Sequence, residues 1–522
     1  MMFRRNNGYN GCVECGGYSG CGGCNVFNMC GSHGDHSSHS VYSSCRSGGV
    51  YSGNDGSIRK EDKLHEECAV FGISTSTDEA AGITYNGLIA MQHRGQEGAG
   101  IAVYSDNKIY LHKDEGLVSE VFPGDGLQQL PKGKTAVGHN RYSTTGSNCK
   151  ENVGPFMTEY LTGRIVTAHN GNVTNACELR KQLEDYGVSF NSTNDSEVVS
   201  SLIAYCMINN KDVLRGIADA ANQMRGAFSL IILTGENQLI AVRDPNGYRP
   251  LCIGQNEHGL VVASESCALD SCGFQFVRDV QPGELVLIED GKILRQQSML
   301  TQNNEHGGLC IFEYVYFART DSIIDGLGVY QARRNMGATL AEEYPTDADV
   351  VCGVPDSGLE AAIGYSLKSG IPLVPGFVKN RYIGRSFIYP VQSQRETAVR
   401  IKLNPLSATI SGKRIVLVDD SIVRGTTSSK IVSSLKHAGA KEVHMRVSSP
   451  PFRHACNFGT DIDSEENLIA NKMSLEAVCR TIGADSLGFI SIGGLKRACA
   501  ESERQFCTYC FDGFGKQSGQ IS

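Results

Sequence analysis

Two adjacent carboxylates, Asp419 and Asp420, stand between a short apolar run and a loop of small residues. The segment reads Arg414-Ile-Val-Leu-Val-Asp-Asp-Ser-Ile-Val-Arg-Gly-Thr-Thr427 and precedes an amphipathic stretch, 429–438. A carboxylate pair can accept hydrogen bonds from vicinal sugar hydroxyls or hold Mg²⁺ on a diphosphate, because hard cations favour carboxylate oxygens. Small residues at a helix start let backbone N–H groups approach an oxyanion. The segment predicts a phosphate-binding site; the alternative is a turn that only caps the helix.

The thiol of Cys68 is the second candidate for chemistry. It stands in Glu66-Glu-Cys-Ala-Val-Phe-Gly-Ile73, at the start of the first strand expected in the chain. If the bond before Cys68 were cut, the thiol would share its residue with a free α-amine of pKa about 8, which is a base at working pH. The pattern is compatible with a nucleophile, and equally with a small buried hydrophobic residue.

Two kinds of element must position these groups. Short alternating strands are predicted in the first half, at 68–73, 100–104, 164–169, 228–233, 239–242 and 260–263. From about residue 349 the pattern becomes strand, loop and helix, with continuous apolar strands at 350–354 and 415–418. Continuous runs are typical of strands buried on both faces of a parallel sheet. We place the boundary between the halves near residue 300, in the polar stretch 301–308.

The composition excludes several classes of protein. The chain has 522 residues, which predicts two or three domains, and 40% of them are hydrophobic. No apolar run reaches the roughly 18 residues of a membrane span. A net charge of -8 argues against a large nucleic-acid footprint. We therefore expect neither nucleic acid nor a membrane as a partner.

Residues 1–67 form a separate leader, rich in Gly, Ser, Cys and Asn, which we predict to be disordered. The pairs Cys12/Cys15 and Cys21/Cys24, with His residues nearby, suggest a metal knuckle, but the pairs are closer together than in common zinc ribbons. The leader has no apolar secretory region, so we expect a cytoplasmic location, where cysteines stay thiols, ligands or nucleophiles.

The segment around Asp419 and Asp420 resembles the phosphoribosylpyrophosphate (PRPP) loop of type I phosphoribosyltransferases. Val354-Pro-Asp-Ser-Gly358 resembles their pyrophosphate loop, and Lys379-Asn-Arg-Tyr-Ile-Gly-Arg-Ser-Phe387 resembles a basic flap that closes over polyphosphate, unless it is a solvated charged loop. The resemblance assigns contacts with PRPP to Lys379, Tyr382, Arg385, Asp419, Asp420, Ser421, Arg424, Gly425, Thr426 and Thr427. It assigns Mg²⁺ to Ser357, Asp419 and Asp420.

The segment around Cys68 resembles the glutaminase domain of N-terminal-nucleophile amidotransferases. Four motifs in order carry the resemblance: Gln92-His-Arg-Gly-Gln-Glu-Gly-Ala-Gly100, Gly138-His-Asn-Arg-Tyr-Ser-Thr-Thr-Gly146, Ala168-His-Asn-Gly-Asn-Val-Thr-Asn175 and Asn194-Asp-Ser-Glu197. It implies that Cys68 is the nucleophile and that Asn170 and Gly171 form the oxyanion hole. Arg141 would grip the α-carboxylate of glutamine, Asp195 its α-amino group, and Arg94 would support this site beside the nucleophile.

Together the two halves resemble the amidophosphoribosyltransferase family, over about 66–513. The resemblance implies an α+β N-terminal-nucleophile (αββα) glutaminase domain at 68–300, then an α/β type I phosphoribosyltransferase domain with a parallel sheet at 301–500 and a tail at 501–522. The implied reaction releases ammonia from glutamine and adds it to C1 of PRPP, displacing pyrophosphate, as the first committed step of purine synthesis. Purine nucleotides as feedback inhibitors and a homotetramer are further implications.

Four cysteines match the ligands of a [4Fe-4S] cluster in the iron-sulfur-containing branch of this family: Cys310, Cys456, Cys507 and Cys510. Only Cys507-x-x-Cys510 is a local motif, which zinc or redox chemistry would also explain. The family pattern makes the cluster structural. Thr320 stands where the family usually has Pro, a loop change that we expect to have no effect. The alternatives to this enzyme are a sugar-phosphate aminating enzyme and a catalytically silent PRPP-binding regulator or iron-sulfur redox sensor.

Overall fold

The computed structural model describes residues 68–124, 126–142, 149–161, 163–210, 212–299, 308–380, 403–462, 464–500 and 505–513. The predictions made for the leader 1–67 and its cysteine pairs, for Tyr382 and Arg385, and for the stretch 301–307 concern residues outside this description. Among the described helices, none combines the length and the apolar composition that a bilayer crossing requires.

Two antiparallel sheets build the first half. The first has the order β11-β9-β10-β1-β4-β2-β3 and the second β13-β12-β8-β7-β6-β5. The strands of the first sheet are β1 (Ala69–Thr75), β2 (Gly98–Ser105), β3 (Lys108–Glu115), β4 (Thr135–Arg141), β9 (Cys252–Asn256), β10 (Gly259–Ala263) and β11 (Gln275–Asp279). Those of the second are β5 (Phe156–Tyr160), β6 (Gly163–Val173), β7 (Gly226–Thr234), β8 (Leu239–Arg243), β12 (Glu284–Glu289) and β13 (Lys292–Ser298).

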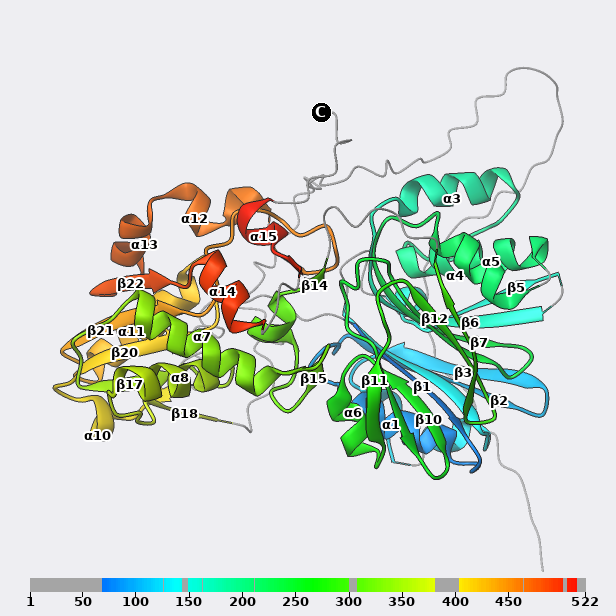
Figure 1. Ribbon diagram of the computed structural model, residues 1–522, viewed down its shortest axis with the longest axis horizontal. Helices are drawn as coiled ribbons and strands as arrows, with labels where there is room; N and C mark the ends of the chain where they lie inside the picture. Colours follow the sequence, from blue (N-terminus) through cyan, green and yellow to red (C-terminus); the bar gives the residue numbers. More distant parts are fainter. Residues whose placement is uncertain are drawn as a thin grey trace, which may run out of the picture. The chain divides into compact units, whose positions relative to one another are not determined.

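Helices cover the outer face of each sheet (Figure 1). Helices α1 (Ala80–Ala90), α2 (Val118–Val121) and α6 (Ser266–Ser271) pack on the first sheet. Helices α4 (Asp195–Asn209) and α5 (Val213–Ala221) pack on the second, and α3 (Ala176–Asp185) lies against α4. Separate apolar cores fill the space under each helix layer and between the sheets. This is the four-layer αββα arrangement that the sequence predicts.

Strand β1 is buried at every position. Phe71 and Ile73 point into the core under α1, whereas Val70 points into the core between the sheets. Alternate side chains of a strand face opposite ways, so a strand covered on both faces has no polar side. Gly72 leaves room for the second sheet, because an added Cβ would lie 2.6 Å from the Ile231 side chain.

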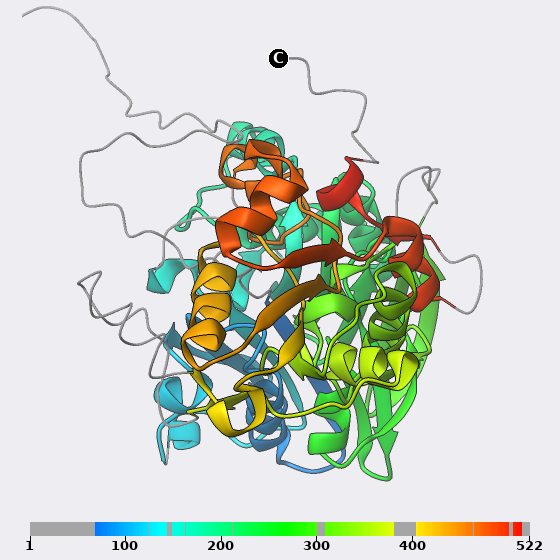
Figure 2. The same ribbon diagram turned by 90° about the vertical axis from the view of Figure 1, so that its left-hand side faces the viewer.

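A parallel sheet of order β17-β20-β21-β22 forms the centre of the second half. Its strands are β17 (Val350–Gly353), β20 (Arg414–Asp419), β21 (Glu442–Val447) and β22 (Ser486–Phe489). The main helices are α7 (Val329–Glu343), α8 (Leu359–Ser369), α11 (Thr426–His437), α13 (Leu475–Ile482) and α14 (Ile492–Ala498), with shorter α10 (Ser407–Ile410), α12 (Ile469–Lys472) and α15 (Tyr509–Asp512). In Figure 2 the strands run between α7 and α8 on one side and α11 and α13 on the other.

Three two-stranded sheets complete the second half: β14 (Leu309–Cys310) with β23 (Phe506–Cys507), β15 (Ile323–Ile324) with β16 (Leu327–Gly328), and β18 (Phe377–Lys379) with β19 (Leu403–Pro405). The strand predictions at 350–354 and 415–418 are confirmed by β17 and β20. The predicted helix 429–438 begins earlier, at Thr426, because Gly425 adopts a left-handed conformation (φ 83°) that starts the helix directly after the loop.

Candidate active sites

Cys68 lies immediately before β1, beside the end of β4. The register pairs Ala69 with Asn140, which places Arg141 next to Cys68. The Cys68 Sγ lies 3.4 Å from both the backbone nitrogen and the carbonyl oxygen of Tyr142. Two neighbouring antiparallel strands therefore hold the Cys68 thiol and Arg141 at the same end of the sheet.

Strand β6 brings Asn170 and Gly171 from the second sheet. The ring Nε2 of His139 lies 3.0 Å from the carbonyl oxygen of His169, which joins β4 to β6 across the two sheets. Asn170 is fully buried, and both polar atoms of its side chain lack a hydrogen-bond partner among the described residues. A buried amide with free donors is costly unless a ligand satisfies it, and it suits an oxyanion hole.

Asp195 occupies the first turn of α4. Its carboxylate accepts a hydrogen bond of 3.0 Å from the Val173 N–H at the end of β6, and it is 6% exposed. The helix starts here because the Asn194 side chain caps the Ser196 N–H at 2.9 Å. The same strand therefore carries the candidate oxyanion hole and fixes the carboxylate proposed to bind an amino group.

Burial favours the uncharged form of two histidines at this site, His139 and His169. Burial lowers the pKa of His139 to about 3, and burial likewise lowers the pKa of His169 despite the nearby Asp195. His169 Nδ1 lies 2.9 Å from Ser196 Oγ. Both imidazoles therefore act as uncharged hydrogen-bonding groups that join strands and a helix.

Arg94 contacts the backbone of the candidate nucleophile, Cys68. Its Nε donates to the Cys68 carbonyl oxygen at 3.2 Å, and its two terminal nitrogens pair with Glu265 (2.6 Å) and Glu313 (2.9 and 2.8 Å). The side chain has no solvent exposure. These ion pairs favour the supporting role suggested by the sequence over a direct contact with glutamine.

Gly171 provides a test of the oxyanion strand. Its φ of 145° is rare for other residues, and an added Cβ would lie 2.1 Å from the Ala227 carbonyl oxygen. We expect Gly171→Ala to lower the free energy of unfolding by about 1–3 kcal/mol or more and to shift β6. Denaturant unfolding measures this loss. Gly187→Ala is the matched control, because Gly187 also has a positive φ (87°) but nothing within 4 Å of the added atom.

The second site lies where β20 ends. Asp419 and Asp420 are 2% and 3% exposed, and the Asp420 N–H donates to Asp419 Oδ1 at 3.0 Å. The hydroxyls of Ser357 and Ser421 both donate to the Asp420 carboxylate. Ser357 follows β17, so the two loops predicted to bind one ligand meet at the carboxyl edge of the parallel sheet, where open α/β sheets bind ligands.

Other residues predicted to bind PRPP follow the same loop. Thr426 and Thr427 form the first turn of α11, and Arg424 and Gly425 directly precede it. Lys379 ends β18 and forms an ion pair with Asp356 in the Ser357 loop. The structure therefore brings the basic flap's first residue to the pyrophosphate loop.

The four matched cysteines gather in the second half. Cys310 and Cys507 are paired across β14 and β23. Burial raises the pKa of Cys507 to about 12, with a further increase from Cys456, and the pKa of Cys510 is raised by burial and by its three neighbours. Within the described residues, no three His, Cys, Asp or Glu side chains are arranged to hold a metal ion.

The loop after Cys456 contacts the first half, which the sequence does not predict. Asn172 donates to the Asn457 carbonyl at 2.8 Å, and Arg249 donates to the Phe458 carbonyl at 2.6 Å. An added Cβ at Gly459 would lie 3.1 Å from the Gly171 carbonyl carbon. The oxyanion strand and the cysteine group are thus connected through one short loop.

Comparisons with known proteins cover both halves. A glutamine amidotransferase domain model matches residues 139–271, and a phosphoribosyl transferase domain model matches residues 320–453. The amidophosphoribosyltransferase of Synechococcus elongatus is 47% identical over 460 residues, which cover 87% of this chain and 92% of that protein. The amidophosphoribosyltransferase of Bacillus subtilis is 45% identical over 456 residues, covering 86% and 94%.

A solved structure is similar to this chain over both halves. The glutamine PRPP amidotransferase from B. subtilis, complexed with ADP and GMP, matches with a TM-score of 0.80 and 43% identity. The match covers 87% of this chain and 99% of that one.

Proposed function

The chain belongs to the amidophosphoribosyltransferase family, and from this premise we propose which residues perform each half of the reaction. The protein is a glutamine amidotransferase and a phosphoribosyltransferase of purine biosynthesis: ammonia from glutamine replaces the pyrophosphate of PRPP and gives 5-phosphoribosylamine. One observation carries the assignment of residues. The chain holds both Cys68 beside Arg141 and the Asp419–Asp420 pair beside Ser357.

In the first half, Cys68 attacks the side-chain amide of glutamine. Arg141 forks the α-carboxylate and Asp195 binds the α-amino group, which leaves the amide over the thiol. Asn170 and the N–H of Gly171 stabilise the oxyanion of the tetrahedral intermediate. Ammonia leaves, and water hydrolyses the glutamyl thioester. The α-amine of Cys68, exposed by removal of residues 1–67, takes the thiol proton.

Removal of the leader has a direct test. The intact mass of the purified active protein should correspond to a chain that begins at Cys68. A chain that begins at Met1 and still hydrolyses glutamine contradicts the proposed base.

In the second half, Asp419 and Asp420 bind the ribose hydroxyls of PRPP, and the backbone of the loop from Ser421 to Thr427 cradles the 5-phosphate. Arg424 adds charge there, and Lys379 adds charge at the pyrophosphate; the contacts expected of Tyr382 and Arg385 concern residues outside the described part of the chain. Ser357 and the two carboxylates present the oxygen donors that Mg²⁺ favours, so they would hold this ion, which neutralises the leaving pyrophosphate. Ammonia then attacks C1 of PRPP.

The thiols of Cys310, Cys456, Cys507 and Cys510 fit a [4Fe-4S] cluster in donor type and number. Burial above all, and Cys456 in addition, raises the pKa of Cys507, and bound iron would offset both effects because it favours the thiolate form. When bound, the cluster would tie the chain's tail to the second half. We propose this structural role for the four residues.

Iron removal tests the cluster. We expect protein purified without oxygen to contain iron and acid-labile sulfide, and Cys510→Ser to lose both and to unfold at a lower temperature. Cys499→Ser is the matched control, because Cys499 is also buried but lies outside the group. Wild-type protein free of iron and sulfide contradicts the proposal.

A paired assay tests the whole assignment. Purified protein with PRPP and Mg²⁺ should release pyrophosphate with either glutamine or ammonium as the nitrogen donor. Activity with neither donor would favour the alternative of a catalytically silent regulator or redox sensor.

Regulation and assembly are also proposals. The B. subtilis structure contains ADP and GMP, which supports purine nucleotides as inhibitors of this chain. Inhibition assays with both nucleotides test this, and light scattering tests the homotetramer. The cytoplasmic location, the domain limits near 300 and 500, and the absence of nucleic-acid partners stay predictions.

A further inference from the structure

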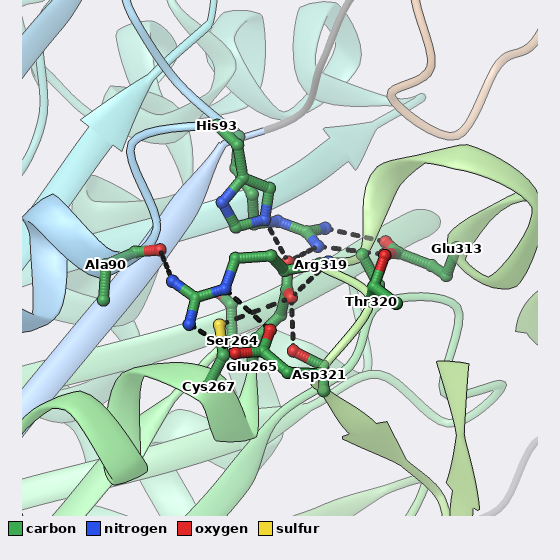
Figure 3. A network of polar contacts seen from close by, with 12 residues as sticks. Ala90, His93, Ser264, Glu265, Cys267, Glu313, Arg319, Thr320 and Asp321 are labelled. Atoms are coloured by element: carbon green, nitrogen blue, oxygen red, sulfur yellow. Dashed lines mark hydrogen bonds and ion pairs between the residues drawn. The ribbon is translucent and has the colours of Figure 1, made fainter. Parts of the chain in front are cut away.

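Glu265 lies at the centre of a buried network that joins the two halves of the protein. It stands between β10 and α6, and its side chain has no solvent exposure. Figure 3 shows His93, Cys267 and Arg319 around its carboxylate. Neither the sequence motifs nor the proposed reaction uses this residue.

The two carboxylate oxygens of Glu265 face different parts of the chain. Oε1 accepts from Arg94 Nη1 at 2.6 Å and lies 2.8 Å from His93 Nε2. Oε2 accepts from the Arg319 backbone N–H at 2.9 Å and from Ser322 Oγ at 2.7 Å. The first oxygen therefore contacts the glutaminase half, whereas the second contacts the turn formed by 319–322 and also accepts from Cys267 Sγ of the first half at 3.7 Å.

The Oε1 side leads to the nucleophile. Arg94, held by Glu265 and Glu313, donates through Nε to the Cys68 carbonyl oxygen at 3.2 Å. A planar guanidinium that is fixed at both terminal nitrogens has no freedom to rotate. The orientation of the Cys68 backbone is therefore set by the carboxylates beyond Arg94.

The Oε2 side leads to the phosphoribosyl half. Thr320, in the 319–322 turn, donates to Glu360 of α8 at 3.0 Å and accepts from Arg333 of α7 at 3.0 Å. The start of α8 directly follows the loop of Ser357, whose hydroxyl contacts Asp420. One carboxylate thus lies between the nucleophile and the frame of the PRPP site.

The Glu265 carboxylate is a buried charge that depends on the donors around both of its oxygens. Glu265 has a depressed pKa, because the interactions with His93 and Arg94 outweigh the effect of burial, so it is ionised in the folded protein. An ionised carboxylate that accepts from several donors on both sides holds all of them at fixed positions.

We propose that Glu265 is a positioning residue for the chemistry at Cys68. Through Arg94, Glu265 fixes the position of the Cys68 carbonyl group. Through the 319–322 turn, it fixes that position with respect to the phosphoribosyl half. The inference rests on the proposed role of Cys68.

Glu265→Gln tests the proposal. Glutamine keeps the size of the side chain and one acceptor oxygen. Its other oxygen is replaced by an NH₂ group, which cannot accept a hydrogen bond, and the loss of the negative charge weakens the attraction to Arg94. We expect kcat of the glutamine-dependent reaction to fall about 30-fold, because small displacements of a nucleophile have large effects on rate. The KM for glutamine should change less than about threefold, since Arg141 and Asp195 keep their positions. The rate of the ammonia-dependent reaction should also change less than about threefold.

Glu284→Gln is the matched control. Its carboxylate also pairs with an arginine, Arg278, at 2.8 Å through both oxygens, but it lies on β12 of the second sheet. We expect the control to leave both reactions unchanged. An equal loss of the glutamine and ammonia reactions in Glu265→Gln, or a loss no larger than that of the control, overturns the proposal.

Ser322→Ala provides a second test that does not depend on the folding of Glu265→Gln. It removes one donor to Oε2 and leaves the Arg94 contact in place. We expect a three- to tenfold fall, roughly, in the glutamine-dependent kcat alone. An unchanged rate shows that the 319–322 turn does not act on Cys68. Glutamine-dependent activity in Cys68→Ser would instead reject the proposed nucleophile, whatever the result at Glu265.

Discussion

Cys68→Ser loses glutamine-dependent synthesis by at least about 10⁴-fold and keeps the ammonia-dependent reaction within about threefold. A serine hydroxyl is a far weaker nucleophile than a thiol at neutral pH, and the thioester cannot form without sulfur. The phosphoribosyl half does not depend on this atom, so added ammonium still reaches C1 of PRPP. Pyrophosphate release with each nitrogen donor measures both reactions on one sample.

Cys177→Ser is the control for this experiment. Cys177 is an exposed cysteine of α3, and its replacement should leave both reactions unchanged. Equal loss of both reactions in Cys68→Ser would assign the thiol to folding rather than to chemistry. Retained glutamine activity would show that another group attacks the amide.

The sequence predicts the local arrangement well where a motif and an element coincide. Asp419 and Asp420 follow a continuous apolar run, and such runs are typical of strands in a parallel sheet that is covered on both faces, so the sequence indicates both the sheet and the position of the acids. Cys68 directly precedes β1, which is buried at every position because helices cover one face of its sheet and a second sheet covers the other. The strand pattern thus predicts the parallel sheet, whereas the αββα layers follow from the resemblance to N-terminal-nucleophile amidotransferases.

Contacts between distant segments were not predictable from local patterns. Glu265 stands in Ala263-Ser-Glu-Ser-Cys267, which has no periodicity or motif that suggests a buried carboxylate. Its donors come from residues 93–94 and 319–322, and only the folded chain brings them together. A charged residue in a short segment between a strand and a helix is ordinarily exposed, so the sequence favours the wrong environment.

Thr320 shows the same limit. The sequence gives no sign of its contacts, but its hydroxyl donates to Glu360 and accepts from Arg333. A proline could make neither contact. The Thr320 hydroxyl therefore links α7 and α8 beside the 319–322 turn through residues that are 13 and 40 positions away in the sequence.

Asp420→Asn should have the largest effect on the second half. The Asp420 carboxylate accepts from Ser357 and Ser421, which join the two loops of the PRPP site. Asparagine keeps the shape but removes the charge that would attract Mg²⁺ and orient a ribose hydroxyl. We expect synthesis with both glutamine and ammonia to fall about 10²- to 10³-fold, because the charge acts at the reacting sugar. Hydrolysis of glutamine without PRPP should stay within about threefold.

Asp349→Asn separates this chemical effect from stability. Asp349 directly precedes β17, at the opposite edge of the same sheet, and it accepts from the Arg414 backbone at 2.8 Å and from its side chain at 2.9 Å. Its replacement removes a similar carboxylate from the sheet but not from the ligand edge. If Asp349→Asn lowers the rate as much as Asp420→Asn, the acids support the sheet only. If Asp420→Asn spares the ammonia reaction, the strand-end pair does not bind the sugar that ammonia attacks, because that reaction needs PRPP but not Cys68.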